Sequence, residues 1–253
     1  MTIAEVMRQV GRRLVHKQWL IFYPLALAII NTLGFLAVYG AAGRELDWRQ
    51  FFAAHFDRWQ FVREHFISGF SFTPALGVAV FAGLAVCVFA AMLRAPLFRA
   101  IAGRGYPLAP RSWEETARLT LFYVIFNLVL VVLPLTAPSG SALEQLVGWA
   151  ALVVNLFVVY ADYVIVFEGL NVLPAIRRSV RLLMRRWPPV LLIFVVLWLI
   201  ARGLSELYSR YYAGAAGVSI LVPLSEILVW SFISLLFDLL LIFLYDHVRN
   251  SPR

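Results

Sequence analysis

Six long apolar runs alternate with short polar segments along the chain. They cover residues 20–40, 72–93, 119–135, 143–167, 190–207 and 220–245. About 20 apolar residues suffice for a helix to cross the roughly 30 Å hydrocarbon core of a bilayer. The pattern therefore predicts an all-α, polytopic integral membrane protein, in which residues 1–253 form a single domain with six transmembrane helices.

Composition supports this prediction and excludes a soluble domain. The chain is 62% hydrophobic and only 14% charged, whereas soluble domains carry about 25% charged residues. Its single cysteine, Cys87, lies inside an apolar run, so no internal disulfide can form.

The polar segment between the fourth and fifth runs, residues 168–189, is rich in arginine. At helical spacing, one face carries the apolar residues Leu173, Ile176, Val180, Leu183 and Trp187, and another carries Arg178, Arg181 and Arg185. The segment contains five arginines: Arg177, Arg178, Arg181, Arg185 and Arg186. An amphipathic cationic helix between two spans is expected to lie at the membrane interface.

Positive charge also predicts the orientation of the chain. Sixteen of the 22 Lys and Arg residues lie in the four segments that six spans place on one side of the membrane. By the positive-inside rule, that side and both termini are cytoplasmic. The net charge of +8 then indicates anionic lipid headgroups rather than nucleic acid as the partner. A homo-oligomer or a partner protein is also possible on this surface.

The N-terminal segment is basic and precedes an apolar run, as in a secretory signal peptide. Because that run is long enough to span the membrane and no small-x-small cleavage site follows it, a retained first helix is the expectation. Residues 7–19 also align with residues 176–187, pairing Arg8 with Arg177 and Arg12 with Arg181. This alignment suggests an internal repeat.

Residues 44–70 mix charged and aromatic side chains, which favours a helix resting on the outer leaflet. His55 and His65 would lie about 15 Å apart along such a helix, so no metal site is expected.

A stripe of small residues recurs every four positions in the second span: Ala75, Ala79, Gly83, Cys87 and Ala91. Such stripes let membrane helices pack closely. The stripe is therefore expected to face neighbouring helices, with a substrate path as the alternative.

Ionisable residues within spans are costly and are candidate functional sites. Asp162 and Asp238 are expected about 10 Å deep in the inner leaflet, and Arg118 enters the third span at that level. An ion pair of Arg118 with either aspartate would act as a structural clamp, and a proton or cation pathway is the alternative.

Two further polar groups lie near mid-depth. Asn127 and Asn155, on adjacent spans, are expected to share an interhelical hydrogen bond. Arg202, near the far end of the fifth span, is expected to snorkel outward.

Sequence motifs of enzymes are missing. The chain has no H-E-x-x-H, no G-x-S-x-G and no Walker motif. We therefore expect no catalytic residues, no metal and no cofactor.

The stretch from the fourth span into the fifth resembles the membrane domain attached to some glycerophosphodiester phosphodiesterases, and related stand-alone six-helix proteins. The matching positions are Glu168, Ala175, Ile176, Ser179, Leu183 and the apolar run after Pro189. The resemblance implies a bacterial plasma-membrane domain without an assigned reaction, because the phosphodiesterase domain is absent.

Two functions fit these features. The first is a non-enzymatic membrane protein that organises lipid or a partner through its arginine-rich cytoplasmic surface. The second is the permease subunit of a transporter that works with a separate ATPase, which would require a polar cavity.

Overall fold

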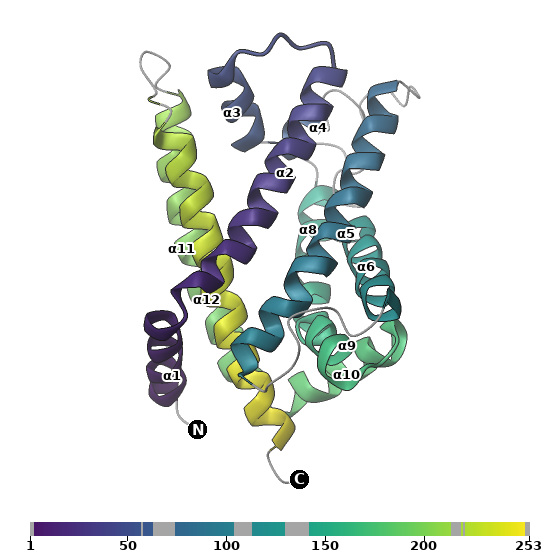
Figure 1. Cartoon of the computed structure of the whole chain (residues 1–253), viewed down its shortest axis with the longest axis vertical. Coiled ribbons are helices and arrows are strands. Elements are labelled where there is room, and N and C mark those ends of the chain that lie inside the picture. Colours follow the sequence, from purple (N-terminus) through teal and green to yellow (C-terminus); the bar gives the residue numbers. More distant parts are fainter. Residues whose placement is uncertain are drawn as a thin grey trace.

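The computed structural model describes residues 3–56, 58–62, 74–103, 113–129, 142–213, 219 and 221–250. The regular elements of these residues are helices (Figure 1). They are α1 (Ile3–His16), the short 3₁₀ helix η1 (Gln18–Ile21), α2 (Phe22–Ala41), α3 (Trp48–Phe56), α4 (Arg58–Val62), α5 (Pro74–Ala102), α6 (Trp113–Asn127), α8 (Ala142–Val158), α9 (Ala161–Glu168), α10 (Val172–Arg185), α11 (Trp187–Ala213) and α12 (Leu221–Asn250). The all-α prediction is confirmed.

Five stretches within the described ranges are long and apolar enough to cross a membrane. They are Gln18–Ala41, Leu76–Ala102, Gln145–Glu168, Trp187–Tyr212 and Leu221–Arg249. These match five of the six predicted spans. The remaining prediction, 119–135, begins in α6 and runs beyond residue 129 into residues outside the described ranges.

Two of these stretches differ in helical extent from the predicted spans. The second span was expected to end at residue 93, but α5 continues as one helix through Pro96 to Ala102. The expected fourth span, 143–167, is two helices, because the chain turns at residues 159–160 between α8 and α9.

Both ends of the described chain lie at the same end of the bundle, together with α1, α9 and α10 (Figure 1). We call this the terminal end. The opposite end, the far end, carries α3 and α4 (Figure 1). The larger apolar core joins α5, α6, α9, α10 and α12, and a smaller core joins α2 to α3 and α4.

The predicted small-residue stripe on α5 is only partly buried. Cys87 and Ala91 are in the core, whereas Gly83 is exposed. Ala79 packs partly buried at the smaller core, and the side chain of Ala75 lies outside the described set. The close approach to α2 is made elsewhere. A Cβ built on Gly34 of α2 would lie 3.5 Å from Val86 Cγ2 and 3.7 Å from Ala82 Cβ, in ordinary van der Waals contact.

The α1 helix is fastened to the end of α5. Lys17 Nζ donates to the carbonyl oxygen of Ala100 at 2.8 Å, so a cation meets the unpaired carbonyls of a helix C-terminus. Gly103, at φ 68°, ends α5, and the guanidinium of Arg13 packs over it. Glycine is favoured there because other residues rarely adopt this left-handed backbone conformation.

In the two aligned basic segments, the residue that interrupts the helix lies at the same aligned position. Lys17 has φ −131° and ψ 52°, and Arg186 has φ −149° and ψ 59°. Each residue separates a basic helix from an apolar one. This likeness supports the internal repeat, which stays a prediction.

The apolar face predicted for this segment is partly buried in the bundle. Leu183 is buried, and Ile176 and Val180 are half-buried. Leu173 and Trp187, the latter at the start of α11, are 59% and 51% exposed. The side chains of α10 packed into the bundle are Val172, Ala175, Ser179, Leu182 and Leu183. Small residues occupy the middle of this face because α10 packs closely against the turn between α8 and α9.

Candidate functional site

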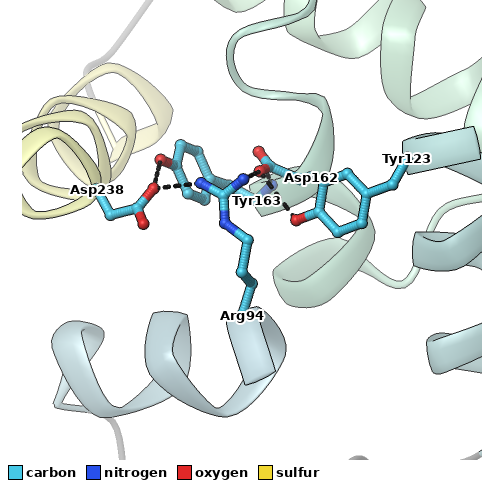
Figure 2. Close-up of polar contacts among 5 residues, drawn as sticks. All are labelled: Arg94, Tyr123, Asp162, Tyr163 and Asp238. Carbon is cyan, nitrogen blue, oxygen red and sulfur yellow. Dashed lines mark hydrogen bonds and ion pairs between the residues drawn. The ribbon is translucent and has the colours of Figure 1, made fainter. Parts of the chain in front are cut away.

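A buried cluster of charged and phenolic groups joins four helices near the terminal end (Figure 2). Arg94 comes from α5, Tyr123 from α6, Asp162 and Tyr163 from α9, and Asp238 from α12. The carboxylate-bearing residues are buried, with Asp238 only 1% exposed and Asp162 7% exposed. Each of these side chains points toward the guanidinium of Arg94 (Figure 2).

The guanidinium lies between the two carboxylates. Its Nη2 donates to Asp238 Oδ1 at 2.6 Å, and its Nη1 lies 3.7 Å from Asp162 Oδ2. The guanidinium also lies over the rings of Phe98 and Tyr123, at 5.1 Å and 5.6 Å from their centroids. One arginine of α5 thus contacts α6, α9 and α12 together.

Tyrosine hydroxyls and a backbone amide complete the shell around the carboxylates. Tyr163 donates its hydroxyl to Asp238 Oδ1 at 3.0 Å and its backbone N–H to Asp162 Oδ1 at 2.9 Å. The hydroxyl of Tyr123 lies 3.4 Å from Asp162 Oδ2. Buried carboxylates require such donors, because leaving them unsatisfied in a low-dielectric interior is costly.

The predicted partner of the aspartates was wrong. An ion pair of Arg118 with one of the two aspartates was expected, but the cation that contacts both is Arg94. The Arg118 guanidinium donates to the carbonyl of Gly169 at 2.7 Å and to Glu114 at 3.0 Å. Arg94 lies just beyond the predicted second span, 72–93, because the apolar run ends before it, whereas α5 extends for two further turns.

The predicted asparagine pair is also absent from the described residues. Asn127 donates to the carbonyl of Tyr123 at 2.8 Å and contacts Cys87 Sγ at 3.5 Å. Asn155 lies partly exposed on α8. Because the Asn127 side chain donates a hydrogen bond to the preceding turn of its own helix, it needs no partner on another helix.

A second buried ion pair lies on the same two helices, α5 and α6. Arg99, 2% exposed, forms a two-oxygen contact with the carboxylate of Glu115, which is 8% exposed. Arg99 also lies beyond the predicted end of the second span at residue 93. Together, Arg94 and Arg99 attach the last two turns of α5 to α6, α9 and α12.

The turn between α8 and α9 is held by Ser179 of α10. The Ser179 hydroxyl is fully buried, accepts the backbone N–H of Tyr160 at 3.0 Å and donates to the carbonyl of Phe157 at 2.8 Å. A broken helix leaves backbone groups unpaired, and this hydroxyl satisfies one donor and one acceptor. The position of Asp162 two residues later depends on this turn.

Glu168, at the end of α9, contacts side chains of α10 and α12. Arg178 Nε lies 3.3 Å from Glu168 Oε2, the Tyr245 hydroxyl donates to Oε1 at 2.9 Å, and Arg249 lies 4.0 Å away. Of the five arginines predicted to bind lipid or a partner, Arg178 is therefore engaged within the protein.

The other four arginines of that set are exposed. Arg186 donates to Nε2 of His247 at 2.8 Å, whereas Arg177, Arg181 and Arg185 lie on the outer side of α10. Beside them, Met184 is 63% exposed, as are Leu173 and Trp187 in similar measure. The outer side of α10 therefore combines cationic and apolar groups.

The half-buried imidazole of His55, at the far end, lies in an aromatic environment. Phe35 and Phe51 pack around His55, and His55 Nε2 lies 3.2 Å from Thr32 Oγ1. Because the Thr32 hydroxyl donates to the carbonyl of Ala28 at 2.9 Å, the imidazole must be the donor to Thr32. Burial, and then the nearby charge of Arg58, lower the pKa of His55 to about 4.

Among the described residues, no group of three or more His, Cys, Asp or Glu side chains could hold a metal ion. His65 lies outside these residues. No family model, curated protein or solved structure matches the chain.

Proposed function

We propose that the chain is a non-enzymatic integral membrane protein of the bacterial plasma membrane, with six spans and both termini in the cytoplasm. In this arrangement α6 begins the third span, and the terminal end faces the cytoplasm. The cytoplasmic surface binds anionic lipid headgroups through α10, and the Arg94 cluster is a structural clamp beneath it.

The outer side of α10 carries this proposal. Arg177, Arg181 and Arg185 are exposed there beside exposed Leu173 and Met184. A helix that combines cations with exposed apolar side chains fits the boundary between headgroups and acyl chains. Each cation near an anionic surface contributes about 1 kcal/mol of attraction.

The proposal is tested by measuring whether anionic lipid co-purifies with the protein in excess of its share of the membrane. The protein is reconstituted in vesicles of equal phosphatidylglycerol and phosphatidylcholine and extracted in mild detergent, and the co-purified lipid is quantified by mass spectrometry. Wild type should retain phosphatidylglycerol several-fold above its share of the vesicle. The variant R177E/R181E/R185E should retain the two lipids in their bulk ratio.

A control of equal charge change is available at the far end. The variant R44E/R49E/R210E should keep the wild-type enrichment, since it leaves α10 intact. If the α10 variant retains as much phosphatidylglycerol as wild type, the proposal is wrong.

The permease alternative requires a polar cavity. The pocket between α11 and α12 is lined by apolar side chains apart from Ser234. It therefore gives no support to a polar substrate path.

A further inference from the structure

Arg202 is an exposed cation on the lipid-facing side of α11. It lies within the apolar stretch Trp187–Tyr212, 15 residues from its beginning and thus about 22 Å along the helix axis. A charged side chain at such a position needs a partner or a route to the headgroup layer. A long arginine side chain provides that route by extending toward the interface.

Within the described part of the chain, Arg202 contacts an aromatic ring and no carboxylate. Its guanidinium lies 5.8 Å from the centroid of Trp198. Glu206, one turn further along, is paired instead with Arg210 at 3.1 Å. The charge of Arg202 is thus available for an anion supplied from outside the described residues.

An apolar pocket of about 290 Å³ adjoins this arginine between α11 and α12. Trp198, which stacks against Arg202, is one of its walls. Its other walls include Phe194, Leu197, Trp230, Ile233 and Phe237. The rings of Phe194 and Phe237 contact each other at 5.2 Å, on the side of the pocket toward the terminal end. The pocket therefore lies beside Arg202, on the side toward the terminal end.

We propose that a membrane phospholipid occupies this place, with its phosphate at Arg202 and one acyl chain in the α11–α12 pocket. Phosphate is the anion that a bilayer offers at this depth, and guanidinium groups bind it through paired hydrogen bonds. The apolar walls match an acyl chain, since they offer water few hydrogen-bond partners.

The leaflet follows from the proposed function, because a cytoplasmic terminal end places Arg202 toward the outer leaflet. This lipid site is separate from the α10 surface, which lies at the terminal end. The α10 variant R177E/R181E/R185E should therefore keep this lipid, so the two proposals can fail independently.

Native mass spectrometry of the full chain, released from detergent micelles, tests the site. Phosphatidylethanolamine, phosphatidylglycerol and phosphatidylcholine are each supplied as the probe. Wild type should retain one tightly bound phospholipid. R202Q should lower its occupancy at least five-fold, and R202K should restore part of it.

Two further variants separate the phosphate contact from folding. A201F fills the pocket beside an unchanged Arg202 and should also displace the lipid. R210Q removes another exposed arginine of the same helix and should leave occupancy unchanged.

The proposal is overturned if A201F and R202Q both retain the lipid as wild type does. It is also overturned if wild type is a lipid-free dimer that either variant dissociates, since a second copy of the chain would then occupy the pocket.

Discussion

The terminal end and the far end of the bundle are held together by different chemistry. At the terminal end, Arg94 and Arg99 are paired with carboxylates inside the protein, and Arg94 meets a residue 144 positions away. At the far end, the smaller core consists of aromatic and aliphatic side chains. Phe35 and Tyr39 of α2 pack there on Phe61 of α4, each with ring centroids 5.4 Å apart.

This difference indicates how the chain is assembled. The aromatic contacts join helices that follow one another, so they can form from a single segment of about 30 residues. The ion pairs join α5, α9 and α12, so they require most of the chain to be in place. Ion pairs with defined geometry also specify which helices become neighbours. Apolar packing specifies neighbours poorly in a lipid environment, because the lipid tails are as apolar as the side chains.

The largest effect is expected from replacing Arg94. R94Q leaves two carboxylates in the bundle interior without their shared cation, and removing one partner of a buried pair costs about 3–5 kcal/mol. Thermal unfolding in detergent should show this loss. The neutral variant R94Q/D162N/D238N should recover part of it, and a triple variant less stable than R94Q would contradict the clamp.

Two adjacent glutamates provide the next comparison. Glu115 is buried against Arg99, whereas Glu114 makes an exposed contact with Arg118 one turn away. We expect E115A to cost about 3 kcal/mol because a buried charge loses its counter-ion. E114A should cost less than about 0.5 kcal/mol. Equal destabilisation of the two variants in thermal unfolding would argue against the buried pair.

A smaller loss is expected at the turn between α8 and α9. S179A removes the hydroxyl that pairs with Tyr160 and Phe157, leaving two buried backbone groups unsatisfied at a cost of about 1–3 kcal/mol. The exposed hydroxyl of Ser209 bonds only within its own helix, so S209A is the matched control. A denaturation midpoint of S179A equal to that of S209A would refute this role.

The smallest effect concerns pH at the far end. His55 is neutral in the folded protein because its pKa is lowered to about 4, whereas the unfolded chain binds a proton below about 6.5. Stability is therefore greatest above pH 6.5 and falls between pH 6.5 and 4, by roughly 1 kcal/mol at pH 6. Hydrogen exchange of α3 at pH 7.5 and pH 6 measures this change. H55Q should remove most of the pH dependence, and an unchanged dependence in H55Q would exclude His55 as its source.

The sequence allowed the helical class and five of the spans to be predicted, because apolar runs of this length have few alternatives. It also identified Asp162 and Asp238, since a carboxylate within a span is rare enough to be noticed. Arg94 was missed because it follows the apolar run directly and precedes Pro96, a pattern typical of a loop.

The residues that pair could not be predicted for a physical reason. Helical spacing shows which side chains share a face, but it does not fix the rotation of one helix against another. The buried face of α10 illustrates this limit. Leu173 lies on the apolar side of the helical pattern but faces outward, at 59% exposed. Ala175 and Ser179 lie in the middle of the buried face, where α10 packs against the turn between α8 and α9.

The most direct test of the clamp is amide hydrogen exchange of R94Q and F61A in nanodiscs, followed helix by helix. Since local openings report the units that unfold together, R94Q should raise exchange in α9, in the last turns of α5 and in the second half of α12 at once. F61A should raise it only in α2, α3 and α4. Faster exchange in R94Q confined to α5 would contradict the claim that Arg94 joins these helices.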